Sequence, residues 1–232
     1  MSENIKKITK AFVVDLDSSK NQNIILKPSA RPFNNQAHQV NEAAKKIYKL
    51  IEGAKHPNND TILNHSEIKE AFFSPFEPQL KDAQVFLSHS HADKNKALKV
   101  KNYLESETNH RVFIDSLFWD YKDNVLNKLA KYDNTSKIKD AFVLILRESL
   151  QDMIEKCPYF VFLQSNNSVS NQGLSRITYS AWIYEELKIA HSIRESRPTP
   201  TMESMQVLHD ISPFLENLET ITLKELSQQI NS

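Results

Sequence analysis

Glu186 is the side chain whose position most suggests chemistry. It follows Trp182 by four residues within a predicted helix over residues 179–194, so the two side chains share one helical face. The adjoining face is apolar and consists of Ile183, Leu187 and Ala190. A carboxyl group at the border of a buried stripe is partly desolvated, which raises its pKa. On helical geometry alone, a solvated glutamate beside Glu185 is the alternative, and Glu185 is the weaker candidate.

A second set of potential ligands lies in one short loop. His89 and His91 alternate there, and Asp93 follows two residues later. This spacing could suit a metal ion, but the loop has neither a nearby cysteine nor an obvious third ligand. We therefore predict no metal site. Asp93 is expected to cap the helix that follows it.

The elements that must position these residues alternate between strands and helices from residue 82 onward. Apolar runs predict strands at 84–88, 111–115, 159–164 and 205–209. Amphipathic patterns predict helices at 93–106, 122–131, 137–156 and 179–194. Continuous apolar strands are typical of a sheet that is covered on both faces. The pattern predicts an α/β domain with a flavodoxin-like parallel sheet and helices on both faces.

The segments after the first three strands are polar, and they cover residues 88–93, 116–121 and 165–175. In open α/β sheets, ligands bind beyond the carboxyl ends of the strands, where the strand order reverses. A flavodoxin-like order, assumed by analogy, would bring four side chains to one cleft there: Ser88, His89, Trp119 and Glu186.

Residues 1–80 differ from the rest and are predicted to form an N-terminal α+β extension that regulates or assembles the protein. Short apolar runs at 11–16 and 24–26 predict a β-hairpin. Helices are expected at about 36–53, ending near Gly53, and at 65–73. Residues 81–232 would form the main domain, which ends in a helix that starts at a capping box of Thr222 and Glu225.

Composition excludes several classes of function. The formal net charge is zero, so no long-range field favours nucleic acid or an anionic membrane. The single cysteine, Cys157, fits a reducing cytoplasm and is expected to be a small buried residue. The chain has only two glycines, Gly53 and Gly173, which excludes a glycine-rich phosphate cradle. No apolar run approaches the roughly 18 residues that span a bilayer.

Three motifs in order resemble a TIR (Toll/interleukin-1 receptor) domain of the bacterial kind, over about residues 80–212. They are DAQVFLSHSHADK at 82–94, RVFIDS at 111–116 followed by Trp119, and SAWIYEEL at 180–187. The glycine usual after the second strand is missing, and FWDY stands there. That departure, together with the long segment between the second and third strands, is similar to the Thoeris-type TIR proteins of anti-phage defence.

The resemblance implies an enzyme that cleaves the nicotinamide–ribose bond of NAD, as substrate and without a cofactor. The glutamate that matches Glu186 is required for this reaction in TIR enzymes. The cleavage passes through an oxocarbenium-like centre, which one carboxylate could stabilise. Ser88 and His89 correspond to the nucleotide-contacting loop. Asp115 could bind ribose or cap the next turn.

Trp119 and Trp182 complete the implied nucleotide site. Trp119 could stack on a base or on the nicotinamide ring, or pack against its own loop. The product could be ADP-ribose or a cyclic isomer. The implied partners are further copies of the chain or another defence protein. Two alternatives stay open, which are a non-enzymatic TIR adaptor and an enzyme similar to nucleoside deoxyribosyltransferases.

Overall fold

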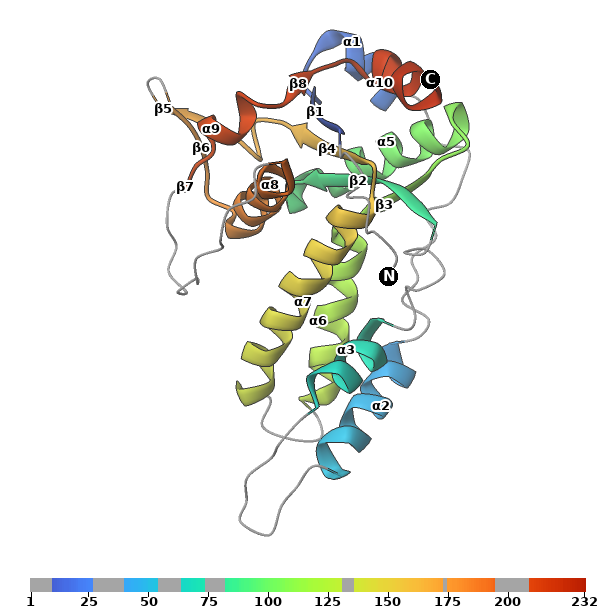
Figure 1. Cartoon of the computed structure of the whole chain (residues 1–232), viewed down its shortest axis with the longest axis vertical. Coiled ribbons are helices and arrows are strands. Elements are labelled where there is room, and N and C mark those ends of the chain that lie inside the picture. Colours follow the sequence, from blue (N-terminus) through green and yellow to red (C-terminus); the bar gives the residue numbers. More distant parts are fainter. Residues whose placement is uncertain are drawn as a thin grey trace, which may run out of the picture. The chain divides into compact units, whose positions relative to one another are not determined.

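A five-stranded parallel sheet is the centre of the fold, with the strand order β3-β2-β4-β1-β8. The computed structural model describes residues 10–26, 40–53, 64–73, 82–130, 136–172, 175–194 and 209–232. Figure 1 shows the central strands side by side. The strands are β1 (Lys10–Asp15), β2 (Ala83–His89), β3 (Arg111–Ile114), β4 (Tyr159–Gln164) and β8 (Glu219–Thr220).

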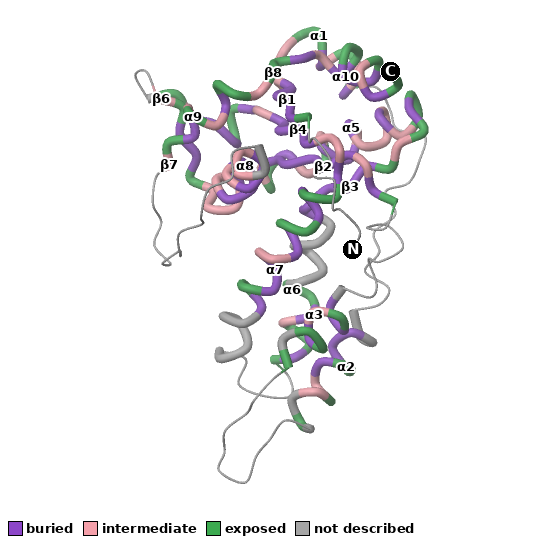
Figure 2. The backbone as a smooth tube through the Cα atoms, viewed as in Figure 1, coloured by how far each residue is buried: buried purple, intermediate pink, exposed green. Residues whose placement is uncertain are grey.

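The first three predicted strands are confirmed, and so is their order. β2, β3 and β4 pair in parallel in the order β3-β2-β4, as a flavodoxin-like sheet requires. Their apolar side chains are buried along almost the whole strand, which Figure 2 shows as continuous purple segments. Phe86 of β2 stacks on Phe160 of β4, with ring centroids 5.8 Å apart. The apolar runs therefore form the core of the sheet.

Helices flank the sheet. α5 (Lys94–Glu107) connects β2 to β3 and packs on both strands, while α8 (Ala181–Arg194) follows β4 and packs on β2. α1 (Ser19–Ile25) and α10 (Leu223–Asn231) pack against α5, and α10 begins at the predicted capping box of Thr222 and Glu225.

The predicted N-terminal hairpin is wrong. β1 lies within the main sheet, between β4 and β8, and pairs in parallel with both. The second half of the expected hairpin is helix α1, in which Ile25 is buried and Leu26, just past its end, is 69% exposed. Four consecutive buried residues of β1, from Ala11 to Val14, explain this position, because only an interior strand is covered on both faces.

The predicted fourth strand at 205–209 lies mostly outside the described residues. Its last residue belongs to β7 (His209–Asp210), which pairs antiparallel with β6 (Ser175–Thr178). Together with β5 (Ser170–Gln172), these strands form a separate three-stranded sheet, and β5 lies in the polar segment 165–175, where no strand was predicted. The short helix α9 (Ser212–Leu215) follows it and packs on α8.

The chain divides into two compact units. The first unit comprises residues 1–33, 83–115 and 151–232, and the second comprises residues 34–82 and 116–150. One division, between residues 82 and 83, is close to the predicted boundary at 80. Residues 10–26, however, belong with the sheet. The regulatory role predicted for residues 1–80 stays a prediction.

The second unit is helical in its described part. It contains α2 (Val40–Gly53), α3 (His65–Phe73), α6 (Ser116–Leu129) and most of α7 (Ser136–Lys156). The predicted amphipathic helices α2 and α3 are confirmed, and α2 packs on both α3 and α6. Phe72 of α3 meets Phe142 of α7 edge to face, with centroids 5.0 Å apart. Within the described ranges, no helix is long and apolar enough to cross a membrane.

Candidate functional site

Polar residues collect at the carboxyl edge of the parallel sheet. β1 ends in Asp15, β2 ends in Ser88 and His89, and Asp115 directly follows β3. Because the strands are parallel, these ends all lie at the same edge. Asp115 and the two β2 residues are at most 4% exposed. This edge therefore buries polar groups that an ordinary hydrophobic core would exclude.

Glu186 joins this edge from helix α8. The hydroxyl of Ser180 caps the helix by accepting a hydrogen bond from the amide of Ile183 at 3.3 Å. The predicted apolar stripe is buried as expected. Burial raises the pKa of Glu186 well above its usual value, and the nearby carboxylate of Asp115 adds to this effect, while the nearby hydroxyl of Ser88 acts in the opposite direction. The structure thus brings together three predicted site residues from three elements.

Glu186 is more deeply buried than its helical pattern predicted. We expected it at the border of the core, but its exposed fraction is 0%. Glu185, the weaker candidate, is also buried, at 1%. Its carboxylate lies 3.8 Å from the ammonium group of Lys188. The reason is that α8 packs on β2 and also on β6 and α9, so more than one of its faces is covered.

His89 and Asp115 form the second contact of the cluster. The His89 Nδ1 and Asp115 Oδ1 atoms are 2.9 Å apart, which is an ion-pair distance, although the ring N–H is not aligned for a hydrogen bond. Burial lowers the pKa of His89, but the negative charges of Asp115 and Asp93 and the polar backbone of Leu87 outweigh this effect, so the pKa is raised. Asp115 therefore acts on both His89 and Glu186.

The position predicted for Trp119 is wrong in one respect. Trp119 lies inside helix α6, which begins at Ser116, whereas we expected a loop over 116–121. The segment contains neither glycine nor proline, so nothing prevents the helix from starting early. The side chain of Trp119 is outside the described part of the structure, and its contact with the site stays a prediction. Trp182 is half-buried in the first turn of α8.

The cap predicted for Asp93 is also wrong. Asp93 occupies the N-cap position of α5, but its side chain makes no capping hydrogen bond. It is 1% exposed and instead accepts hydrogen bonds from Ser165 and Asn167 in the loop after β4. Among the described residues, no group of three or more His, Cys, Asp or Glu side chains could hold a metal ion.

Sequence reasoning missed the contribution of β1 to this edge. Asp17, two residues beyond the strand, binds the ammonium group of Lys96 at 3.1 Å and accepts a hydrogen bond from the amide of Asn166 at 3.0 Å. The signal was present, because VVDLD resembles VFIDS as an apolar strand that ends in aspartate. Comparisons of the chain with protein-family models, with curated proteins and with solved structures found no match.

Proposed function

We propose that this protein is a TIR-like enzyme that cleaves the nicotinamide–ribose bond of NAD in the cytoplasm, as part of anti-phage defence. The proposal rests on the three ordered motifs, which resemble bacterial TIR domains, and on a parallel sheet compatible with that fold. One observation carries it, which is the complete burial of Glu186 near Asp115 at the carboxyl edge of the sheet. The glutamate that the resemblance selects has a pKa that burial raises well above its usual value, as is typical of functional carboxyl groups.

The cluster supports a plausible course for the reaction. The bond from the ribose C1′ to the nicotinamide nitrogen breaks, and its electron pair leaves with nicotinamide, which becomes neutral. The positive charge that remains on the ribose is stabilised by the carboxylate of Glu186. Water then attacks C1′ and loses a proton to give ADP-ribose, or a nitrogen of the adenine attacks to give a cyclic product.

The raised pKa of Glu186 fits this course. In the protein without substrate, the group is favoured in its neutral form by burial and by the nearby charge of Asp115. A bound nicotinamide ring carries a positive charge, which favours the carboxylate. Substrate binding would therefore generate the charged form where it is needed. Asp115 and His89 would hold the glutamate in place through their 2.9 Å contact.

The burial of the cluster sets a condition for activity. Glu186 is fully buried, so NAD can reach it only after the surrounding segments move. In TIR enzymes the site is often completed by a neighbouring subunit. We therefore expect activity in an assembled state and little activity in dilute monomer.

The test is nicotinamide release from NAD over a wide range of protein concentration, with products resolved by mass spectrometry. Glu186→Gln should lower release by about a hundredfold to a thousandfold, because a transition-state contact is lost. Glu185→Gln is the matched control, since it changes a carboxyl group of the same helix that is buried to a similar degree. It should keep most of the activity. Equal loss in both variants would contradict the role of Glu186.

A non-enzymatic TIR adaptor is the second candidate, and the burial of Glu186 is the observation that favours it. An adaptor would need the acid cluster only for its structure. Such a protein would release no nicotinamide at any concentration, and Glu186→Gln would leave its self-association unchanged.

A further inference from the structure

Asp93 is a buried carboxylate whose contacts join two loops. It lies four residues after His89, at the end of the short 3-10 turn His91–Asp93 that follows β2. Its Oδ2 atom accepts a hydrogen bond from the hydroxyl of Ser165, and its Oδ1 atom accepts one from the side-chain amide of Asn167 at 2.9 Å. Both partners belong to the loop after β4. Both carboxylate oxygens of Asp93 therefore accept hydrogen bonds from the loop after β4.

The loop after β4 is organised around Ser165. The hydroxyl of Ser165 accepts a hydrogen bond from the amide of Asn167 at 3.0 Å. The amide of Ser165 donates to the hydroxyl of Ser168 at 2.8 Å, and that hydroxyl returns a hydrogen bond to the Ser165 carbonyl at 3.1 Å. Ser165 and Ser168 are buried, at 4% and 3% exposure. The residue that Asp93 contacts is thus the one that fixes the shape of this loop.

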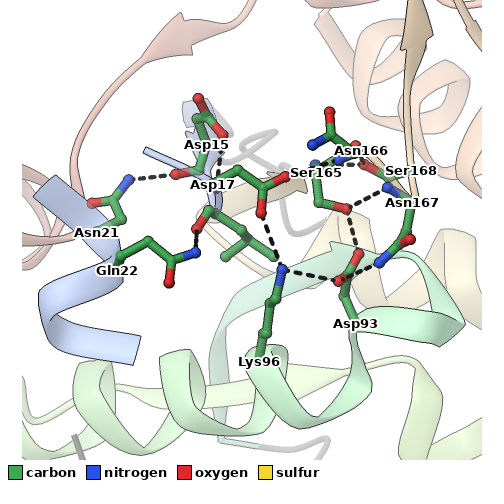
Figure 3. A network of polar contacts seen from close by, with 11 residues as sticks. Asp15, Asp17, Asn21, Gln22, Asp93, Lys96, Ser165, Asn166, Asn167 and Ser168 are labelled. Atoms are coloured by element: carbon green, nitrogen blue, oxygen red, sulfur yellow. Dashed lines mark hydrogen bonds and ion pairs between the residues drawn. The ribbon is translucent and has the colours of Figure 1, made fainter. Parts of the chain in front are cut away.

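A second anchor holds the same loop from β1. Asp17 accepts the amide of Asn166 at 3.0 Å, so the loop is held from both sides. Lys96 connects the anchors, with its ammonium group 3.1 Å from Asp17 and 3.5 Å from Asp93. Figure 3 shows Lys96 between the two aspartates, with the residues of the β4 loop grouped beside them. Three loops at the carboxyl edge therefore share one network.

We propose that Asp93 is a positioning residue, which joins the loop after β2 to the loop after β4 and thereby holds its own negative charge where it acts on His89 at the candidate site. β2 and β4 are adjacent in the sheet, and the crevice at their carboxyl ends is where a ligand of this fold would bind. The catalytic part of the inference rests on the proposed function, whereas the effect of Asp93 on His89 does not.

Two observations favour positioning over a simple helix cap. The side chain makes no capping hydrogen bond to α5, although it occupies the N-cap position. Its charge also reaches His89: the carboxylates that act on this ring are Asp115 and Asp93, and both raise its pKa against the effect of burial. Asp93 thus affects the electrostatics of a site residue that it does not need to touch.

The test is titration of the His89 ring by NMR in histidine-labelled full-length protein. Asp93→Asn keeps the size of the side chain but removes its charge, so the pKa of His89 should fall. Asp17→Asn is the control, because it breaks the other anchor of the same network and Asp17 is not among the groups that act on His89. It should leave the titration of His89 unchanged. An unchanged titration in Asp93→Asn, or an equal fall in both variants, would overturn the proposal.

A kinetic measurement tests the consequence for the reaction. Asp93→Asn should lower kcat for NAD cleavage by about ten- to a hundredfold, as misplacement of a site residue does, with a smaller change in KM. A wild-type protein without activity would refute the proposed function, while the titration of His89 would still decide the positioning role.

A further variant covers the case in which Asp93→Asn does not fold. Asn167→Ala removes one hydrogen bond to Asp93 at an exposed position. It should shift the His89 ring resonances in the same direction as Asp93→Asn, by a smaller amount. Unshifted resonances in this variant would count against the proposal.

Discussion

At the scale of single residues, the burial of Glu186 makes the stability of the protein depend on pH. Its pKa in the folded protein is raised above the unfolded value by burial and by Asp115, so the folded state holds a proton that the unfolded state releases. The stability that depends on this proton is fully present below the unfolded pKa and is lost as the pH rises towards the folded pKa. Each pKa unit corresponds to about 1.4 kcal/mol.

Glu186→Gln should therefore stabilise the protein at pH values above neutrality and have little effect near pH 4. The glutamine side chain has a similar size and is neutral at every pH, so its burial does not require the uptake of a proton. The measurement is the free energy of unfolding of both proteins by urea at each pH. A variant that is less stable than the wild type at high pH would show that the carboxyl group contributes favourable contacts instead. The helical pattern predicted only partial desolvation of Glu186, whereas the side chain is fully buried.

Asp115 should affect the pKa values of two neighbouring groups, His89 and Glu186. Its charge raises the pKa of both His89 and Glu186, because a negative charge favours a cationic ring and disfavours a second carboxylate. Asp115→Asn should lower both pKa values, which NMR titration of the imidazole ring and the side-chain carboxyl carbon would detect. A fall for His89 alone would mean that Glu186 is perturbed by burial only.

At the scale of elements, the sequence predicts what local patterns determine. β2, β3 and β4 were found because their apolar runs match a sheet covered on both faces, and α8 was found from its helical spacing. The place of β1 was not found, because nothing within residues 10–15 specifies that the strand pairs with β4, more than 140 residues later in the chain. The burial of Glu185 and Glu186 was missed for a similar reason, since the elements that cover α8 come from distant segments.

The edge strand β3 shows how a helix protects a sheet. Glu105 of α5 accepts a hydrogen bond from the amide of Val112 at 3.0 Å, and Lys101 donates one to the carbonyl of Val112. Lys101 and Glu105 also pair with each other at 2.6 Å. Free backbone groups on an edge strand promote pairing with other chains, and here a side-chain pair occupies those of Val112.

The double variant Lys101→Ala with Glu105→Ala should lose about 1–3 kcal/mol of stability, because two backbone groups lose their partners. It should also aggregate faster on mild heating. Lys99→Ala, which changes a charge of the same helix, is the control. The measurements are urea unfolding and light scattering at equal protein concentration. Identical scattering by the double variant and the control would contradict the protective role.

At the scale of the whole molecule, β1 makes part of the N-terminal segment a strand of the central sheet. We expected residues 1–80 to form an extension outside the main domain, with a role in regulation or assembly. That expectation conflicts with a strand that pairs along its whole length with β4 and also holds β8. Asp17, just beyond β1, further anchors the loop after β4. Any truncation that removes β1 therefore removes part of the core and part of the candidate site.

Phe12→Ala should accordingly be strongly destabilising. Phe12 is 2% exposed in β1, and truncation of a buried phenylalanine costs about 3–5 kcal/mol. Leu26→Ala is the control, because Leu26 is 69% exposed and should change stability by less than about 0.5 kcal/mol. If residues 11–26 formed a peripheral hairpin, both substitutions would instead reduce the free energy of unfolding only slightly. Urea unfolding distinguishes the cases, and a protein without residues 1–26 that still unfolds cooperatively would disprove the central position of β1.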